Sequence, residues 1–233
     1  MIAGSLPEII LALKQVPFFL GLSDRELTPL ATHCRRRQYR RNQVIFHQDD
    51  PGDSLYVVLS GRVRIVLPSP EGEEDIVLAV FASRDCFGEL SLLDGKPRSA
   101  TAIAQDACEV LTLGRFEFLK HVAGHPAVAL QVLQTLAARL RRTNVLLADF
   151  AFMDLSARLA KRLLELARTQ GERTGPHAPI SIQITQGELA SLVGSRRESV
   201  NKELHAFAER GLLVIQRGCI LIKDPEVLAN SFS

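Results

Sequence analysis

The chain has 233 residues, of which 46% are hydrophobic and 23% are charged, and its formal net charge is +2. This is the balance of an ordinary globular protein, so disorder is not the default expectation, and the length allows one large domain or two smaller ones. No apolar run approaches the roughly 20 residues of a membrane span, and the first residues lack a basic region followed by an apolar one. We therefore expect a cytoplasmic protein with no membrane partner, whose basic surface arises from local patterning.

The four cysteines are widely spaced and belong to no metal-binding pattern. They are Cys34, Cys86, Cys108 and Cys219. None forms a C-x-x-C pair or a Cys/His cluster with zinc or iron–sulfur spacing. We expect reduced thiols, no metal and no covalently bound cofactor.

The first elements in chain order are helices. Residues 6–33 are rich in helix-forming residues, and Ser23 with Glu26 three positions later forms a capping-box pattern. From Cys34 onward the pattern changes to short strands.

The strand region extends to about residue 114. Residues 35–48 predict two strands, residues 54–68 predict a hairpin that turns at Ser60-Gly61, and residues 73–82 predict another strand. Residues 98–113 predict a further strand pair with a bend near Asp106. Many short strands with Gly, Asp and Pro between them indicate a small antiparallel barrel or sandwich. The arginine-rich run at 35–41 is typical of an exposed strand edge.

One stretch in this region, residues 87–102 (FGELSLLDGKPRSATA), places Glu89 and Arg98 at the two ends of a short loop and helix. A salt bridge between them is the simpler interpretation. Alternatively, they hold opposite ends of one small ligand: a guanidinium binds a phosphate monoanion with charge-assisted bonds, and a carboxylate suits a hydroxyl group. Backbone N–H groups at the start of the helix would add donors for the anion.

A long helix is predicted over residues 126–150, with Pro126 in its first turn. Apolar positions alternate at spacings of four and three, which is the seam of a two-stranded coiled coil. The seam positions are Ala129, Leu133, Leu136, Leu140, Thr143, Leu147 and Phe150. An amphipathic helix packed on its own domain is the alternative. Thr143, with Asn144 beside it, interrupts the apolar seam and indicates a register-setting or binding position.

The last third of the chain predicts a helix-turn-helix followed by a hairpin. Capping-box patterns occur at Thr185–Glu188 and at Ser195–Glu198, and Gly194 lies at the turn between the two helices. The second helix has an apolar stripe opposite a polar face of Arg197, Glu198, Asn201, Lys202 and His205. A hairpin turning at Arg217-Gly218 predicts a wing. Such a polar face suits the major groove, where Arg and Lys bond guanine and Glu accepts from cytosine; an ordinary solvated helix face is the alternative.

In this order of parts the chain resembles the Crp/Fnr family of transcription regulators, and its cAMP receptor branch in particular. Residues 87–102 resemble the phosphate-binding cassette of cyclic-nucleotide-binding domains. The resemblance implies that Glu89 bonds the ribose 2′-hydroxyl and that Arg98 pairs with the cyclic phosphate. It assigns Ser99 and the backbone at Gly88 and Leu90 to the phosphate, Thr143 to the base, and Asn144 to the nucleotide of the partner subunit; Asn144 replaces the serine of a well-known relative.

The segment GSRRESVNKE resembles the recognition-helix motif of the same family. By this resemblance Arg197 and Glu198 contact bases, and Lys202 stands where a well-known relative has arginine, so it would bind as a point charge without the bidentate fork. Ser195 and Asn201 complete the expected DNA-binding set. The resemblance also implies a palindromic site with TGTGA-like half-sites, and it places residues 167–179 in the region where relatives touch RNA polymerase.

The sequence therefore predicts an α+β protein with three parts. Residues 1–125 form a jelly-roll-like β-barrel that binds a cyclic nucleotide, residues 126–150 form a dimerisation helix, and residues 151–233 form a winged helix-turn-helix domain. We expect a homodimer that binds double-stranded DNA and RNA polymerase under allosteric control by cAMP. We also expect Arg98→Ala to abolish nucleotide binding while leaving the fold intact.

The sequence leaves three alternative functions open. A regulator of the same fold could sense cGMP, a cyclic dinucleotide or another small molecule, or could bind DNA without ligand. A haem or cluster sensor would need ligating Cys or His residues, for which His33 and His47 are the nearest candidates. An enzyme would need a nucleophile–base pair, a metal triad or a P-loop, and the sequence contains none of these patterns; we therefore expect no enzymatic activity.

Overall fold

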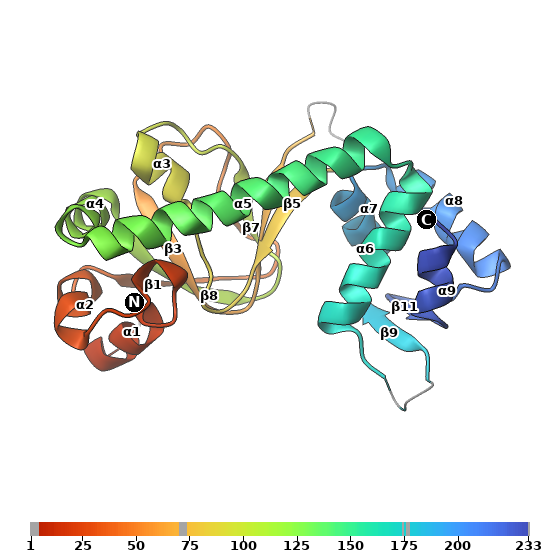
Figure 1. Ribbon diagram of the computed structural model, residues 1–233, viewed down its shortest axis with the longest axis horizontal. Helices are drawn as coiled ribbons and strands as arrows, with labels where there is room; N and C mark the ends of the chain where they lie inside the picture. Colours follow the sequence, from red (N-terminus) through yellow and green to blue (C-terminus); the bar gives the residue numbers. More distant parts are fainter. Residues whose placement is uncertain (1–4, 70–73, 174, 176–177, 233) are drawn as a thin grey trace. The chain divides into compact units, whose positions relative to one another are not determined.

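The computed structural model describes residues 5–69, 74–173, 175 and 178–232 (Figure 1). The chain forms two compact units, one from Met1–Leu67 with Leu78–Thr143 and the other from Pro68–Val77 with Asn144–Ser233. In the described part of the chain, no helix is long and apolar enough to cross a membrane. The structure confirms the predicted α+β class, because helices and antiparallel sheets occur in both units.

The first unit begins with the predicted helices. They are α1 (Leu6–Leu13), a 3₁₀ turn (Pro17–Phe19) and α2 (Asp24–Ala31). The capping box at the start of α2 is confirmed, since the Glu26 N–H donates to Ser23 Oγ while the Ser23 N–H donates to the Glu26 carboxylate.

Eight strands of the first unit form two four-stranded sheets. The strands are β1 (Arg35–Tyr39), β2 (Val44–Phe46), β3 (Ser54–Ser60), β4 (Val63–Leu67), β5 (Ile76–Phe81), β6 (Cys86–Phe87), β7 (Thr101–Ala104) and β8 (Cys108–Gly114). Their orders are β1-β8-β3-β6 and β2-β7-β4-β5. The pairs β1–β8, β3–β8, β3–β6, β2–β7 and β4–β7 are antiparallel. The arginine-rich β1 is an edge strand, as predicted.

The connection at Ser60-Gly61 is not the predicted hairpin. β3 pairs with β8 and β6, whereas β4 lies in the other sheet beside β7 and β5, so the chain passes from one sheet to the facing one at this turn. The strands on either side of Asp106 also form, as β7 and β8, but they belong to different sheets. This alternation between sheets is what allows two four-stranded sheets to enclose a common core.

The core of the first unit has two layers. One lies between the two sheets and includes Val58, Val63 and Ala102, which come from strands of both sheets. The other lies on the outer face of the first sheet, where Leu55 and Leu111 pack with the helices α1, α2, α4 (Arg115–Gly124) and the start of α5. β3 is therefore buried on both faces. This burial holds β3 in place beside the 87–102 segment.

Helix α5 (Pro126–Phe152) is the long helix that the sequence predicts, two residues longer at its end. Val128 and Val132 pack into the core of the first unit, so one face of its first half lies on its own unit, as the alternative interpretation expects. Leu133, Leu140 and Leu147 of the expected seam are 63%, 62% and 66% exposed. The helix therefore has two apolar faces, and one of them is uncovered in the single chain.

The second unit contains the predicted helix-turn-helix and wing. Its elements are α6 (Leu155–Gln170), β9 (Ile180–Gln183), α7 (Gln186–Val193), α8 (Arg197–Glu209), β10 (Leu213–Gln216), β11 (Cys219–Ile222) and α9 (Pro225–Asn230). The strands form a sheet in the order β10-β11-β9, and the core joins side chains such as Leu163, Ile182 and Leu204. Of the 167–179 segment, residues 174, 176 and 177 lie outside the described residues.

The turn between α7 and α8 requires its glycine. Gly194 has φ +59°, and a Cβ there would lie 2.5 Å from the Phe150 ring. The capping box at Thr185–Glu188 is confirmed. The capping box predicted at Ser195–Glu198 is wrong. The N-cap of α8 is Arg196, and no side chain caps this helix. Glu198 is therefore the second helical residue, whereas a capping box needs a glutamate at the third.

Candidate functional site

Arg98 is the buried basic residue of the 87–102 segment, with only 3% of the residue exposed. Its Nη1 donates to the Gly88 carbonyl and its Nη2 to the Ser54 carbonyl, both at 2.8 Å. The guanidinium lies over the Phe46 ring at 4.3 Å and near the Tyr56 ring at 5.6 Å. β2 and β3 thus supply an aromatic wall, and the side chain has one fixed direction.

The charge of Arg98 is incompletely compensated. Among the residues that the structure describes, no carboxylate forms an ion pair with it, and its Nε is buried without a hydrogen-bond partner. Burial lowers the pKa of the guanidinium, because removal from water disfavours the charged form. A buried cation that no carboxylate contacts directly is costly, so this position favours the binding of an anion.

Glu89, the first residue of α3 (Glu89–Asp94), is also buried, with 3% exposed. Its Oε1 lies 2.6 Å from Nη1 of Arg139, which belongs to α5. Nη2 of Arg139 donates to the Cys86 carbonyl, and its guanidinium lies over the Phe81 ring at 4.7 Å. The carboxylate is therefore held by a side chain of the long helix, and Figure 1 shows α3 beside α5.

The salt bridge between Glu89 and Arg98 is not among the ion pairs of the described residues. Each of the two side chains is instead held by other partners, Glu89 by Arg139 and Arg98 by the backbone carbonyls of Gly88 and Ser54. The simpler interpretation of the 87–102 segment is therefore wrong. The two opposite charges of the segment therefore do not neutralise each other by direct contact.

Gly88 makes the close approach in this segment possible. Its φ is +83°, and a Cβ at this position would lie 2.7 Å from Nη1 of Arg98. The next residues differ in exposure: Leu90 is 46% exposed and Ser99 is exposed, so both reach the surface of the segment. The structure thus buries Glu89 and Arg98 beside the partly buried Gly88, whereas Leu90 and Ser99 are exposed.

The sequence did not identify Arg139 as a site residue. It lies one helical turn before Thr143, whose Oγ1 donates to the Arg139 carbonyl at 3.1 Å. Arg139 and Thr143 are four residues apart, so they lie on the same face of the helix. This spacing is the one feature of the sequence that could have identified Arg139 as a site residue. Thr143 and the following Asn144 are both exposed. Phe46 and Tyr56 were also missed, because contacts between distant strands leave no local pattern.

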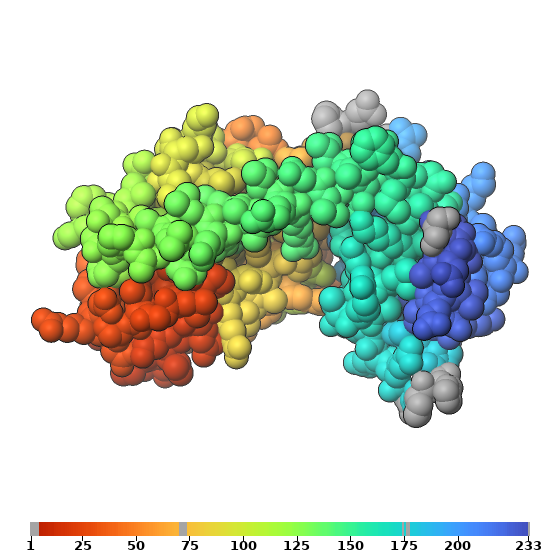
Figure 2. Space-filling model, viewed as in Figure 1, coloured from red at the N-terminus to blue at the C-terminus, as the bar shows by residue number. Residues whose placement is uncertain are grey.

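The uncovered face of α5 follows the predicted seam. In Figure 2 the green side chains of this helix lie at the surface of the view over most of its length. Ala129, Leu136 and Phe150 are partly buried, whereas Leu133, Leu140 and Leu147 repeat every seven residues and are exposed. An exposed apolar stripe with this repeat is typical of a helix that packs against a second helix.

The expected DNA-binding residues lie on or before the first turns of α8. Arg197, Glu198 and Lys202 are exposed, while Ser195 in the turn and Asn201 are partly buried. Val200, Leu204 and Phe207 are buried on the opposite side, which confirms the predicted division of the helix. This geometry leaves a row of charged and polar groups facing outward from a rigid helix.

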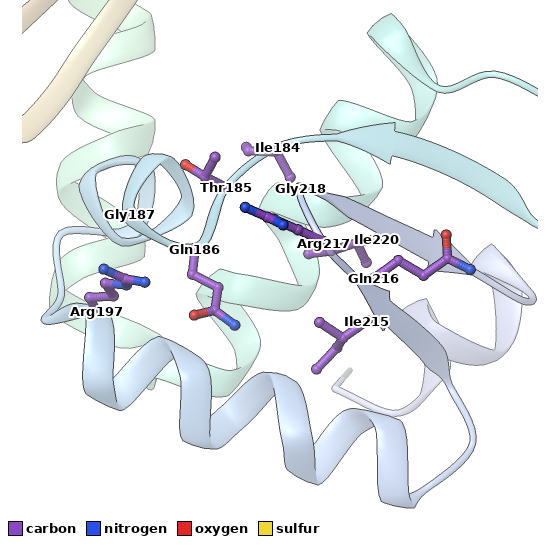
Figure 3. A pocket seen from close by; sticks show the side chains of 10 residues that line it. All are labelled: Ile184, Thr185, Gln186, Gly187, Arg197, Ile215, Gln216, Arg217, Gly218 and Ile220. Atoms are coloured by element: carbon purple, nitrogen blue, oxygen red, sulfur yellow. The ribbon is translucent and has the colours of Figure 1, made fainter.

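A hollow of about 650 Å³ lies between α8, the start of α7 and the wing (Figure 3). Arg197 lines it from α8, Gln186 from α7, and Gln216 and Arg217 from the wing. Ile184, Ile215 and Ile220 supply the apolar part of its lining. Two arginines on different elements therefore border one concave surface, an arrangement that favours the phosphates and base edges of a nucleic acid.

Metal and thiol chemistry find no support among the described residues. These contain no group of three or more His, Cys, Asp or Glu that could hold a metal ion. The four cysteines are free, and burial raises the pKa of Cys34 and of Cys86 to about 12. A thiol with a raised pKa is a poor nucleophile and a poor metal ligand.

Family comparisons match both the region around Glu89 and Arg98 and the helix-turn-helix region. Residues 36–125 match the cyclic nucleotide-binding domain, and residues 157–231 match the Crp-like helix-turn-helix domain. The chain is 36% identical to the CRP-like cAMP-activated global transcriptional regulator of Mycobacterium tuberculosis over 218 residues, which cover 94% of this chain and 97% of that protein. It is 37% identical to the cyclic AMP receptor protein of Thermus thermophilus over 216 residues, which cover 93% and 96%.

Solved structures show the same fold. A CRP-family transcriptional regulator from Thermus thermophilus superposes with a TM-score of 0.69 at 28% identity, covering 83% of this chain and 95% of the other. The c-di-GMP-responsive global regulator of Xanthomonas campestris superposes with a TM-score of 0.78, covering 87% of this chain and all of the other. At 23% identity the second likeness concerns the fold alone.

Proposed function

Because this chain belongs to the Crp/Fnr family of transcription regulators, whose members bind DNA in response to a ligand, we propose that it is a homodimer controlled by cAMP. The chain is a DNA-binding regulator with a cyclic nucleotide-binding domain, and its relatives are transcription regulators, not enzymes.

The buried, incompletely compensated Arg98 beside the buried Glu89 is the observation that carries the proposal. A cyclic phosphate would supply the anion that Arg98 lacks, and the ribose 2′-hydroxyl would donate to the Glu89 carboxylate. Ser99 and the backbone at Gly88 and Leu90 would complete the contacts to the phosphate. Thr143 and Asn144 would meet the base, with Asn144 reaching the nucleotide of the partner subunit.

Adenine is the base we propose, and the named relatives support this choice. The proteins from M. tuberculosis and T. thermophilus, at 36% and 37% identity, are named for cAMP. Thr143 and Asn144 have hydroxyl and amide groups that can both donate and accept, as the edge of adenine requires.

The exposed leucines of α5 support the homodimer. Leu133, Leu140 and Leu147 would pack against the same residues of a second chain, and nucleotide binding would change the register or angle of the two helices. The dimer would then place its two α8 helices in successive major grooves, about 34–36 Å apart. This predicts a palindromic site with TGTGA-like half-sites, read by Arg197, Glu198 and Lys202 with Ser195 and Asn201.

The regulator would act in the cytoplasm, where DNA and RNA polymerase are present. The 167–179 segment, between α6 and β9, is the region we propose for contact with the polymerase. α6 continues to Gln170, and Glu172 forms an isolated bridge with Ser181, so the described ends of this segment are anchored in the second unit.

A calorimetric ligand screen combined with DNA titration tests the proposal. We expect cAMP to bind more tightly than cGMP or c-di-GMP, and we expect it to raise the affinity for a palindromic TGTGA-like site. A ligand shifts the equilibrium only by its difference in affinity for the two states. Equal DNA affinity with and without cAMP would exclude ligand control, and tighter binding of another nucleotide would replace cAMP as the ligand.

Glu89→Gln separates the ribose contact from the phosphate contact. The amide weakens the bond to a donating 2′-hydroxyl, so we expect this variant to bind cAMP about tenfold less tightly. The variant and the wild type should bind 2′-deoxy-cAMP with similar affinity, because that ligand lacks the hydroxyl. A loss of equal size with both ligands would show that Glu89 acts only through Arg139.

Arg197→Ala tests whether α8 reads bases. Loss of one bidentate contact to guanine costs about 1–3 kcal/mol of discrimination, so affinity should fall by roughly 5- to 150-fold for each half-site of the palindrome. Binding to random DNA should change little. Filter binding over a range of salt concentrations distinguishes the cases: equal losses on both DNAs, with a shallower salt slope, would make Arg197 a phosphate contact.

A further inference from the structure

Gln186 and Asn201 form a hydrogen-bonded pair between the two helices of the helix-turn-helix. Gln186 is the first residue of α7, and its Nε2 donates to Oδ1 of Asn201 on α8 at 2.7 Å. Gln186 also lines the hollow beside Arg197, and Figure 3 shows its side chain directed toward α8. Both side chains are partly buried, so the pair lies at the inner edge of the surface that would face DNA.

Asn201 lies one helical turn after Arg197 on the same face of α8. Residues four apart on a helix are neighbours, so the two side chains follow one another along the row that would face base edges. The opposite face of α8 is fixed by burial of Val200, Leu204 and Phe207. The packing of α8 therefore fixes the position of the Asn201 backbone, and the bond to Gln186 fixes the rotation of the Asn201 side-chain amide.

The hydrogen bond determines which groups Asn201 can offer to DNA. An amide is planar, with its oxygen and nitrogen on opposite sides, so an oxygen bonded to Gln186 turns the NH₂ group away from α7. The structure records no other side-chain hydrogen bond for Asn201 among the residues it describes. Its two N–H donors thus remain free, while its acceptor is already engaged.

This orientation makes a specific choice between bases. Guanine presents two acceptors, N7 and O6, in the major groove, whereas adenine presents one acceptor and one donor. An asparagine with free rotation pairs well with adenine by using both its oxygen and its nitrogen. One whose oxygen is engaged is better suited to the two acceptors of guanine.

We propose that Gln186 is a specificity-determining positioning residue, which holds the Asn201 amide as a donor and so selects guanine over adenine at one position of each half-site. This inference rests on the proposed DNA-binding function of α8. Gln186 acts through Asn201, and the pair is a single reading unit assembled from both helices.

Three substitutions test this assignment by changing the bond in different ways. Gln186→Ala removes the donor and frees the Asn201 amide. Gln186→Glu has a similar shape but can only accept, so it would bond the Asn201 NH₂ group and turn the oxygen outward. Asn201→Ala removes the reading group itself. Gln216→Glu is the matched control, because the exposed Gln216 of the wing lines the same hollow and this change adds the same charge there.

The measurement is the relative affinity for a set of palindromes that differ at each base pair, with and without cAMP. We expect the wild type to prefer guanine over adenine at one position by about tenfold. Gln186→Ala should reduce this ratio to about threefold or less, and Gln186→Glu should shift it toward adenine or cytosine, whose edges donate. Asn201→Ala should abolish the preference for guanine over adenine. The double variant Gln186→Ala/Asn201→Ala should show the same affinities as Asn201→Ala.

The possible failures are distinguishable. A wild-type preference that survives both Gln186→Ala and Gln186→Glu would overturn the assignment while leaving the proposed function in place. The same shift in Gln216→Glu would attribute the effect to charge alone and would also overturn it. A wild type that selects no sequence from the set would overturn the proposed function together with this inference. Melting temperatures measured alongside verify that each variant is folded.

Discussion

Arg98→Ala is expected to weaken cAMP binding by more than about 100-fold. The guanidinium is buried and has no carboxylate partner among the described residues, so the cyclic phosphate would be its main counter-ion. Truncating one partner of a buried, hydrogen-bonded charge pair costs about 2–5 kcal/mol. Isothermal titration calorimetry with cAMP measures this loss directly, and wild-type affinity in the variant would exclude Arg98 from the ligand site.

The burial of Arg98 also revises the expectation that this substitution leaves the fold intact. Its removal would leave the Gly88 and Ser54 carbonyls without their donor and would open space beside Phe46. A buried acceptor that loses its partner costs about 1–3 kcal/mol, so the free energy of unfolding should fall measurably. Titrations must therefore be made well below the melting temperature of the variant.

Two further variants separate ligand binding from stability. Arg98→Lys retains the charge but not the fork that reaches two carbonyls, so we expect an intermediate loss of cAMP affinity. Arg62→Ala removes a more exposed arginine of the same unit, which pairs with Asp106 at 2.6 Å. The Arg62→Ala protein should bind cAMP normally, since surface ion pairs contribute little.

Leu140→Glu is expected to convert the dimer into a monomer. Leu140 is 62% exposed in the single chain, so the change should not disturb the fold of its own unit. In the proposed dimer the two copies of this residue would face each other, and two carboxylates in an apolar seam are unfavourable. Light scattering after size exclusion should give the mass of one chain, 25.7 kDa.

The same variant should lose its affinity for the palindrome. Linking two DNA-binding domains raises affinity by about 10²–10⁴-fold through effective concentration, and a monomer forgoes this gain. Ala138→Glu is the matched control, because it places the same charge on an exposed position of α5 turned away from the seam. A Leu140→Glu protein that remains dimeric would rule out this face as the interface.

The sequence predicted most elements of the fold because their patterns are local. Apolar spacing indicated α5 and α8, and the S/T-x-x-E pattern found the true caps at Ser23 and Thr185. The same pattern failed at Ser195, since the backbone begins α8 one residue later, after Arg196. A residue can cap a helix only if it immediately precedes the first helical residue. Tertiary packing determines which residue that is.

The sequence indicated where most of the strands lie, but it did not indicate which strands pair with one another. Alternation of apolar residues on both sides of Ser60-Gly61 is the same whether the two strands pair or enter facing sheets. The structure chooses facing sheets, with β3 beside β8 and β4 beside β7. That choice depends on strands that lie far away along the chain, which no short window contains.

The candidate site divides in the same way. Glu89 and Arg98 lie within one contiguous motif and could be named from it. Arg139 lies far beyond Glu89 in the chain, in an element assigned to the seam, and only the fold brings the two side chains within 2.6 Å. The Gln186–Asn201 bond was equally hidden, because one partner lies on α7 and the other on α8.

The ion pair between Glu89 and Arg139 has a consequence for how the regulator would respond in a cell. It joins the segment that would hold the nucleotide to a side chain of α5, and in the proposed function nucleotide binding and DNA binding are coupled through this helix. Thermodynamic reciprocity then requires DNA to raise the affinity for nucleotide by the factor by which nucleotide raises the affinity for DNA. A chromosome with many strong sites would therefore lower the nucleotide concentration at which the protein becomes half-saturated, and the threshold of the signal would depend on the number of its targets.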